Sequence, residues 1–220
     1  MSPVSAELER NQFKSTEVQP FQASAYTPKP GYEFIKRVFD IVVSSIALVL
    51  LGIPMLFVAL VIKLDSHGPV LFRQQRWGKN SKVFTIYKFR TMRTDAPRDM
   101  ASRDFSDSDH YITRLGAFLR KTSIDELPQL LNIIKGDMSL VGYRPVCLTE
   151  EYLHKLRESY GVMAVRPGLT GYAQVLGRDN IDCQQKARLD GEYVANRSVK
   201  LDLWCVWKTF ATVISGEGVK

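Results

Sequence analysis

Two adjacent carboxylates, Asp125 and Glu126, stand among basic residues and are the strongest candidates for chemistry in the sequence. Arg120 precedes them, and Arg144 and Arg166 follow in the strings Tyr-Arg-Pro and Arg-Pro-Gly. One carboxylate of such a pair can attack phosphorus as a nucleophile while its neighbour holds Mg²⁺, whose charge lets two anions approach. Arginines beside proline or glycine suit bidentate contacts with phosphate oxygens. The pattern therefore predicts phosphate chemistry.

The apolar residues that follow Asp125 repeat at helical spacing and predict a helix that ends at Gly136. They are Leu127, Leu130, Leu131 and Ile134. Ser123 stands three positions before Glu126, as in a capping box, so we expect both carboxylates in the first turn, where the helix N-terminus stabilises anions. Neighbouring helical residues point about 100° apart, so we expect the two carboxylates to have different roles. An ordinary helix cap without catalysis would show the same residues.

A basic stretch before the carboxylates, residues 68–92, predicts two short strands joined by a turn that contains glycine and asparagine. The second strand is supported by an alternating pattern of Val83, Thr85, Tyr87 and Phe89. The arginine and lysine side chains of this hairpin either cradle phosphates or lipid headgroups, or are simply solvated. Residues 94–113 are acidic and polar and predict a solvated loop.

A long apolar segment near the N-terminus, Val38 to Ile62, contains Asp40 as its only charged residue. About 20 apolar residues suffice to cross a bilayer, so its length permits a spanning helix. Gly52 and Pro54 interrupt the segment. Because a proline inside a helix removes an N–H donor and clashes with the preceding turn, we expect a kink at Pro54.

The charges on both sides of this segment favour a return to the same face of the membrane. Lys36 and Arg37 precede it, and residues 63–93 carry eight basic residues against the single acid Asp65. Because basic flanks favour the cytoplasm, both ends are expected there. A helix that enters, bends and returns satisfies both the charges and the proline. A plain spanning helix remains the alternative.

The composition is that of one folded catalytic domain with an anionic partner. The chain has 220 residues, 45% of them apolar and 10% aromatic, and its 30 Lys and Arg residues against 23 Asp and Glu residues give a net charge of +7. This charge suits a phosphorylated substrate, acidic lipids or nucleic acid. The three cysteines and three histidines are scattered, which excludes a disulfide framework and a zinc cluster.

The two ends of the chain complete the predicted organisation. Residues 1–31 are polar with four prolines and predict a flexible tail, followed by a membrane helix at 32–64 and a catalytic domain at 65–220. The apolar segment starts too deep in the chain to be a secretory signal. Near the C-terminus, one helical face carries Leu203, Trp207, Phe210 and Ile214. That face predicts either an interfacial helix on the bilayer or a helix that faces the core.

Several motifs also occur in a fixed order along the chain. They are Phe39-Asp40, Lys88-Phe-Arg-Thr-Met92, Leu119 to Leu130, Lys135 to Gly142, Arg144-Pro145, and Val165 to Gln174. With these motifs the sequence closely resembles the bacterial sugar transferases, small monotopic polyprenyl-phosphate phosphoglycosyl transferases, over about residues 32–215.

The resemblance implies a helix-rich α/β enzyme with a re-entrant, kinked N-terminal helix embedded in the bacterial inner membrane and a catalytic domain on the cytoplasmic face. It implies transfer of a sugar-1-phosphate from a UDP-sugar to undecaprenyl phosphate, with release of UMP, as the first membrane-linked step of exopolysaccharide, capsule or other surface glycan synthesis. We expect UDP-glucose or UDP-galactose as the donor. Membrane lipids are the further partners, nucleic acid is not one, and a homo-oligomer is left open.

The resemblance also implies roles for individual residues. Asp125 matches the nucleophile, which takes the phosphosugar as a covalent intermediate, and Glu126 matches the residue that engages Mg²⁺, the cofactor. The basic positions around the phosphates match Arg120, Arg144 and Arg166. The headgroup-contacting start and the break of the re-entrant helix match Lys36, Arg37 and Pro54, so the resemblance favours re-entry over spanning. By family position alone, residues 177–197, including Asp190, lie near the nucleotide-sugar.

Two positions depart from the family pattern. Ile53 stands where a serine often precedes the helix-breaking proline, so a hydroxyl hydrogen bond to the backbone is lost there. Tyr143 replaces the first proline of the usual Gly-Pro-Arg-Pro turn. This change loosens the backbone before Arg144 and is a candidate determinant of substrate preference.

Two other functions remain open from the residues. A conventional glycosyltransferase would release UDP, and its Asp-x-Asp metal motif is matched by letters at Asp107-Ser-Asp109. A non-enzymatic basic anchor would recruit partners to acidic lipid, and Asp125 and Glu126 would then only cap a helix. Replacing Asp125 by asparagine separates these functions from the transferase.

Overall fold

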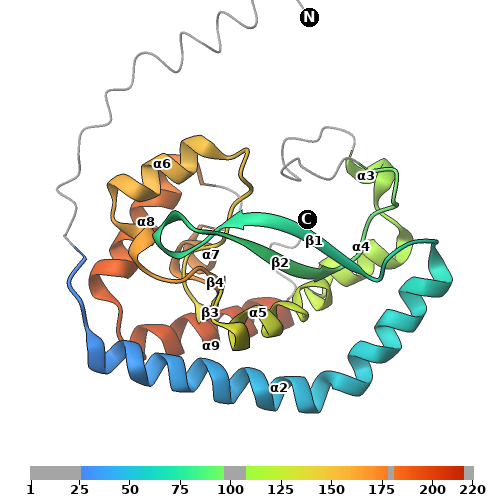
Figure 1. Ribbon diagram of the computed structural model, residues 1–220, viewed down its shortest axis with the longest axis horizontal. Coiled ribbons are helices and arrows are strands. Elements are labelled where there is room, and N and C mark those ends of the chain that lie inside the picture. The colour runs from blue at the N-terminus through green and yellow to red at the C-terminus, as the bar shows by residue number, and fades with distance from the viewer. Residues whose placement is uncertain (1–25, 97–107, 178–180, 216–220) are drawn as a thin grey trace, which may run out of the picture.

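The computed structural model describes residues 26–96, 108–177 and 181–215 of the chain (Figure 1). Most of the expected N-terminal tail and most of the acidic segment at 94–113 lie outside these ranges, as does Asp107 of the Asp-x-Asp string. Within the described part, the fold is a helix-rich α/β arrangement, as the sequence predicted.

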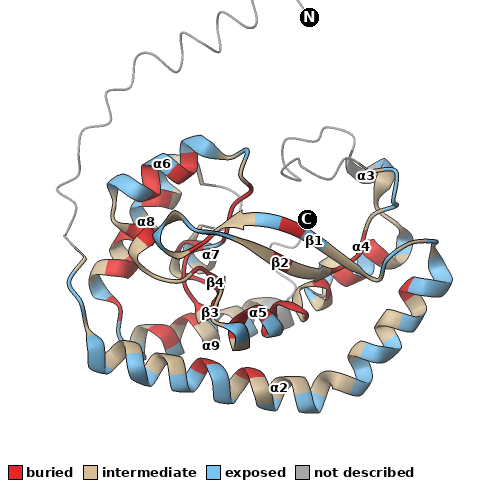
Figure 2. Ribbon diagram, viewed as in Figure 1, coloured by how far each residue is buried: buried red, intermediate tan, exposed pale blue. Residues whose placement is uncertain are grey.

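The apolar segment forms helix α2, Pro30–Asp65, which is continuous over 36 residues and contains Pro54. It begins with Pro30 in its first turn, where the missing N–H costs nothing, and it ends where Ser66 becomes extended. Figure 1 shows that α2 is bent and runs along one side of the molecule. Many of its apolar side chains are exposed (Figure 2), among them Val49 and Ile53 at 81% each. Among the described helices, α2 alone is long and apolar enough to cross a membrane.

The predicted hairpin is confirmed. Strands β1, Leu71–Trp77, and β2, Val83–Phe89, pair antiparallel with Leu71 opposite Phe89. The turn η1, Lys79–Ser81, holds Asn80 and Ser81 at positive φ, which asparagine tolerates better than most residues. A second sheet pairs β3, Ser139–Val141, with β4, Gly168–Thr170, in parallel.

The remaining helices surround these sheets. They are α3 Ser108–Tyr111, α4 Arg114–Lys121, η3 Ile124–Glu126, α5 Gln129–Lys135, α6 Glu151–Ser159, η4 Val162–Ala164, α7 Tyr172–Leu176, α8 Cys183–Asn196 and α9 Val199–Ser215. Helix α5 lies between α2 and the hairpin (Figure 1), and its Leu130 and Ile133 form a buried cluster with Ile86 of β2. Ala47 and Leu48 of α2 pack on the same cluster, so this part of α2 belongs to the core that α5 and β2 form.

The predicted start of the helix after the carboxylates is wrong. Ser123 is at φ +56° and its side chain caps nothing, so the capping box does not form. Asp125 and Glu126 lie in the short 3-10 turn η3, and α5 begins only at Gln129. Pro128 explains the difference, because it has no N–H to donate to a carbonyl one turn earlier. The predicted stop is confirmed, since Gly136 ends α5 at φ +93°.

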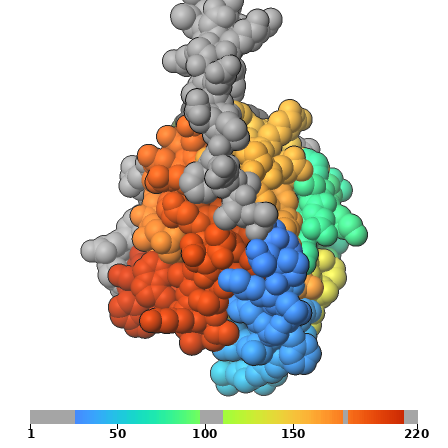
Figure 3. Space-filling model, turned by 90° about the vertical axis from the view of Figure 1, so that its left-hand side faces the viewer, coloured from blue at the N-terminus to red at the C-terminus, as the bar shows by residue number. Residues whose placement is uncertain are grey.

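Helix α9 places its predicted apolar face outward. Leu203, Trp207 and Phe210 are all exposed, with Trp207 at 62%, while Cys205 is fully buried on the opposite side. The alternative in which this face packs into the core is therefore wrong for these three residues. Figure 3 shows α9 beside the first half of α2 on one side of the molecule.

Candidate active site

Asp125 is a buried carboxylate with no partner of its own. Its residue is only 8% exposed, and within the described part of the chain its side chain makes no hydrogen bond and no ion pair. The turn that holds it is tightly closed, because Glu126 N donates to Ser123 O and Leu127 N donates to Ile124 O, both at 3.2 Å. The backbone therefore fixes Asp125 in place while its oxygens remain available for chemistry.

Glu126 has the opposite environment, because two cations bind one of its oxygens. Lys88 Nζ of β2 donates to Oε1 at 2.6 Å, and Arg144 Nη2, from the segment after β3, donates to the same atom at 2.9 Å. Charge-assisted bonds of this length are the stronger class of hydrogen bond. Glu126 thus ties the hairpin and the segment after β3 to the turn that carries Asp125.

The two neighbouring carboxyl groups consequently differ in acidity. Burial raises the pKa of Asp125 to about 6, and the charge of Glu126 adds to this effect, whereas Lys88, Arg120 and Arg144 lower it. Burial alone would also raise the pKa of Glu126, but Arg144 and Lys88 together hold it well below its ordinary value. Environments that push two adjacent pKa values apart are typical of carboxylates with different catalytic roles.

Arg120 and Arg166 occupy opposite ends of this region. Arg120 lies at the end of α4, donates from Nε to Thr91 Oγ1 at 3.0 Å, and is close enough for its charge to act on Asp125. Arg166 donates from Nε to Gly136 O at 2.8 Å, at the far end of α5 from the carboxylates. Of the predicted phosphate-binding arginines, the structure therefore gathers Arg120 and Arg144 at the carboxylates and sets Arg166 apart.

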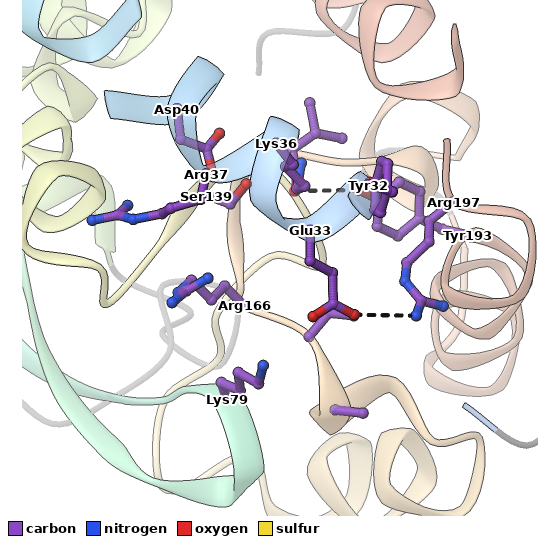
Figure 4. Close-up of a pocket in the computed structure, with 13 residues that line it drawn as sticks. Tyr32, Glu33, Lys36, Arg37, Asp40, Lys79, Ser139, Arg166, Tyr193 and Arg197 are labelled. Atoms are coloured by element: carbon purple, nitrogen blue, oxygen red, sulfur yellow. Dashed lines mark hydrogen bonds and ion pairs between the residues drawn. The ribbon is translucent and has the colours of Figure 1, made fainter. Parts of the chain in front are cut away.

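The basic residues at the start of α2 contact protein groups. Arg37 donates to Ile133 O at 2.6 Å and to Ile134 O at 2.8 Å, so it binds the same end of α5 as Arg166. Lys36 forms a 2.9 Å ion pair with Asp202 of α9. Figure 4 shows these side chains around a pocket beneath α2, together with Lys79 from the hairpin turn.

Lys88 is the site residue that the sequence analysis did not single out. It is the one charged residue of strand β2, and the glutamate it binds is 38 positions away in the sequence. The signals available were its place among the basic residues of the hairpin and in the motif Lys88-Phe-Arg-Thr-Met92. The same motif contains Arg90, a buried residue that donates to the carbonyls of Ser66 and His67 beyond the end of α2.

Glu126 fits a magnesium site that a substrate would complete. In the described residues, no group of three or more His, Cys, Asp or Glu side chains could hold a metal alone. Mg²⁺ bound with nucleotides, however, takes only one or two carboxylates and fills its other positions with phosphate oxygens and water. Glu126 meets that requirement, since its Oε2 has no hydrogen-bond partner among the described residues.

Comparisons with known proteins identify the family of the chain. The model of the family described as "Bacterial sugar transferase" matches residues 31–216. An exopolysaccharide production protein of Rhizobium leguminosarum is 46% identical over 82% of this chain and 94% of its own length. A UDP-N-acetylgalactosamine-undecaprenyl-phosphate N-acetylgalactosaminephosphotransferase of Aeromonas hydrophila is 41% identical over 90% of this chain, and an undecaprenyl-phosphate glucose phosphotransferase of Komagataeibacter xylinus is 40% identical over 86%. The matches cover only 48% and 38% of these last two relatives.

Proposed function

Since the chain belongs to the bacterial sugar transferase family, we propose that it transfers a sugar-1-phosphate from a UDP-sugar to undecaprenyl phosphate and releases UMP. Two relatives of 40% and 41% identity carry names that state phosphosugar transfer to this lipid phosphate. The observation that carries the proposal within this chain is the pair of carboxylates: Asp125 has no partner among the described residues, and Glu126 is held by two cations.

The proposed reaction has two displacements at the phosphorus that carries the sugar. In the first, a carboxylate oxygen of Asp125 forms a bond to this phosphorus, and the bond to the bridging oxygen breaks, so that UMP leaves with the electron pair. In the second, a phosphate oxygen of undecaprenyl phosphate attacks the same phosphorus, and the carboxylate of Asp125 leaves. Splitting one transfer into two displacements is the general use of a covalent nucleophile.

The pKa values suit this division of labour. A carboxylate whose pKa is about 6 is still mostly ionised at neutral pH but is more basic, and hence more nucleophilic, than an ordinary aspartate. Glu126 stays ionised throughout and positions Lys88 and Arg144 beside the reacting phosphate. Mg²⁺, held by Glu126 and the diphosphate, would neutralise the charge that develops on the leaving UMP.

We further propose that α2 is re-entrant and that the catalytic domain lies on the cytoplasmic face. A straight helix of 36 residues would be about 54 Å long, well over the roughly 30 Å thickness of a bilayer's hydrocarbon core. Both ends of α2 are nevertheless tied to the same domain. Near the start, Asp40 accepts the backbone N–H of Leu140 at 3.0 Å, and at the end Arg90 donates to Ser66 O at 2.6 Å.

The exposed apolar residues support a position in one leaflet. Apolar residues are exposed along α2 from Phe34 to Leu64, and Leu203, Trp207 and Phe210 are exposed on α9. Figure 3 shows α9 beside the first half of α2. Such side chains are stable in the acyl region of a membrane, and an amphipathic helix such as α9 suits the headgroup boundary. Impermeant maleimide should label Pro28→Cys and His67→Cys, in a Cys183→Ser background, in inverted vesicles and not in intact cells. Labelling of one position from each side would refute re-entry.

The sugar is proposed as glucose or galactose. Relatives of nearly equal identity name an N-acetylated sugar in one case and glucose in another, so identity alone does not favour either. The deciding experiment gives the detergent-purified protein Mg²⁺, undecaprenyl phosphate and a panel of UDP-sugars, and identifies the nucleotide released.

The expected result is UMP from one donor with the wild-type chain and none with Asp125→Asn. Asp95→Asn is the matched control, because Asp95 is exposed and lies in the segment after the hairpin. Release of UDP would identify a conventional glycosyltransferase, and near-full UMP release by Asp125→Asn would exclude Asp125 as the nucleophile.

A further inference from the structure

The segment that carries Arg144 is held by its carbonyl oxygens. Each of the four consecutive carbonyls of residues 143–146 accepts a hydrogen bond. The donors, in order, are Gly168 N at 2.8 Å, Arg157 Nη1 at 2.8 Å, Arg76 Nη1 at 3.3 Å and Trp77 N at 3.2 Å. The side chain of Arg144 is half exposed where it reaches Glu126, so its position depends on this backbone anchorage.

The donor to the carbonyl of Arg144 is itself unusual. Arg157, from α6, is only 3% exposed, and a buried guanidinium is costly unless it is paired. Asp190 of α8, 2% exposed, supplies the pair: its Oδ2 accepts Arg157 Nε at 2.9 Å and lies 2.7 Å from Nη2 as an ion pair. Both contacts use the same carboxylate oxygen, and Nη1 of Arg157 is left to donate to Arg144 O.

Tyr143 completes the cluster from the other side. Its ring is fully buried, and the guanidinium of Arg157 lies 5.1 Å from the ring centre, within the range of a cation–π contact. The hydroxyl of Tyr143 is buried without a hydrogen-bond partner in the part of the chain that the structure describes. The aromatic ring, and not the hydroxyl, is therefore what this position uses.

We propose that Arg157, held by Asp190 and the ring of Tyr143, is a positioning residue that sets Arg144 against Glu126. In this chain the buried cluster replaces the rigidity that a proline at position 143 would give. The inference rests on the proposed function only in treating Arg144 as part of the transferase site. It also gives Asp190 a structural partner, Arg157, in place of a direct contact with the nucleotide-sugar.

The test is a double-mutant cycle between the cluster and Arg144. Arg157→Lys keeps the buried charge beside Asp190 but cannot make both contacts of the guanidinium, and we expect a loss in kcat/KM of about tenfold or more. In an Arg144→Ala background the same substitution should change kcat/KM less than twofold, because Arg157 acts only through Arg144. Full additivity of the two losses, or wild-type activity in a folded Arg157→Lys variant, would overturn the proposal.

Position 143 provides a second pair of variants if Arg157→Lys does not fold. Tyr143→Phe keeps the ring and should retain wild-type kcat/KM, whereas Tyr143→Leu removes the ring and should lose activity in the same cycle with Arg144→Ala. Equal activity of the phenylalanine and leucine variants would contradict the proposed role of the ring.

A spectroscopic signal of Arg144 itself separates this inference from the proposed function. The Nε–H signal of Arg144, identified by its loss in Arg144→Ala, can be followed by NMR in ¹⁵N-arginine protein without any substrate. A shifted signal in Tyr143→Leu, with Tyr143→Phe unchanged, supports the positioning role even if no donor yields UMP. An unchanged signal in Tyr143→Leu would count against positioning even if the enzyme is a phosphosugar transferase.

Discussion

The raised pKa of Asp125 predicts a specific loss of activity in mild acid. With a pKa of about 6, Asp125 is about 90% ionised at pH 7 and about 10% ionised at pH 5. Only the ionised carboxylate attacks phosphorus, so the rate of the first displacement should fall about tenfold between these pH values. An aspartate with the ordinary value of 3.8 would lose almost nothing over the same interval.

The first displacement can be measured alone. Without undecaprenyl phosphate, the enzyme should release one equivalent of UMP from the donor and stop at the covalent stage, so the phosphate of the lipid cannot contribute to the pH profile. Glu126 does not titrate between pH 5 and 7, because Arg144 and Lys88 hold its pKa far below that window although burial opposes them. The rate of the UMP burst, from pH 5 to 8, therefore reports on Asp125.

The substitution Lys88→Met should shift the pH profile of the UMP burst in a direction that can be predicted. Burial is the main cause of the raised pKa of Asp125, and Lys88 is the cation that opposes it most. Its removal should move the acid limb to higher pH, and a thermal melt at each pH checks that the variant is folded. A burst rate that is flat from pH 5 to 7 in the wild type, or a limb that moves to lower pH in Lys88→Met, would refute the assignment of Asp125 as a buried nucleophile.

Three further predictions concern stability and the metal. Asp125→Asn should raise the free energy of unfolding by up to about 3 kcal/mol at pH 8, because a carboxylate with a raised pKa destabilises the fold above that pKa, and the gain should vanish near pH 4. Urea unfolding at the two pH values measures this difference. Arg90→Met should cost about 1–3 kcal/mol, since it removes the buried donor to the carbonyls of Ser66 and His67 at the end of α2, while the exposed Lys82→Met should change the melt little. EDTA should abolish the UMP burst and added Mg²⁺ should restore it, whereas Glu126→Gln should require more Mg²⁺ for half-maximal rate.

The sequence was sufficient for elements whose signals are local. The apolar run predicted α2, the alternation of residues 83–89 predicted a strand, and Gly136 predicted the end of α5. Each of these depends on the period of side-chain burial or on one backbone conformation, both of which can be read over a few residues.

The sequence was insufficient where the same residue pattern is compatible with two backbone conformations. Ser123 and Glu126 have the spacing of a capping box, but that box needs Ser123 in an extended conformation, and the structure holds it at φ +56°. The proline at position 128 interrupts the N–H donors that a single helix from Ser123 would require. Its effect could have been weighed from the sequence, whereas the left-handed conformation of a serine could not.

Long-range pairing was the other information that the sequence lacked. Lys88 and Glu126 are 38 positions apart, and Arg157 and Asp190 are 33 apart. A single sequence does not show which of its charged residues pair across such distances, because a lysine or arginine in an ion pair cannot be told from a solvated one by residue type. Only the fold, with β2 beside η3 and α6 beside α8, brings them together.

The arrangement of cations explains why two adjacent carboxylates can have different roles at one site. Both approaching cations, Lys88 and Arg144, bond to a single oxygen of Glu126, and neither bonds to Asp125. If either cation paired directly with Asp125, the carboxylate would be less basic and its oxygens would be occupied. If both were removed, burial beside a second carboxylate would raise the pKa of Asp125 further and protonate it at neutral pH. Lys88 and Arg144 therefore lower the pKa of Asp125 while they are bonded to Glu126. This arrangement keeps the pKa of Asp125 near neutrality and leaves its oxygens available to attack phosphorus.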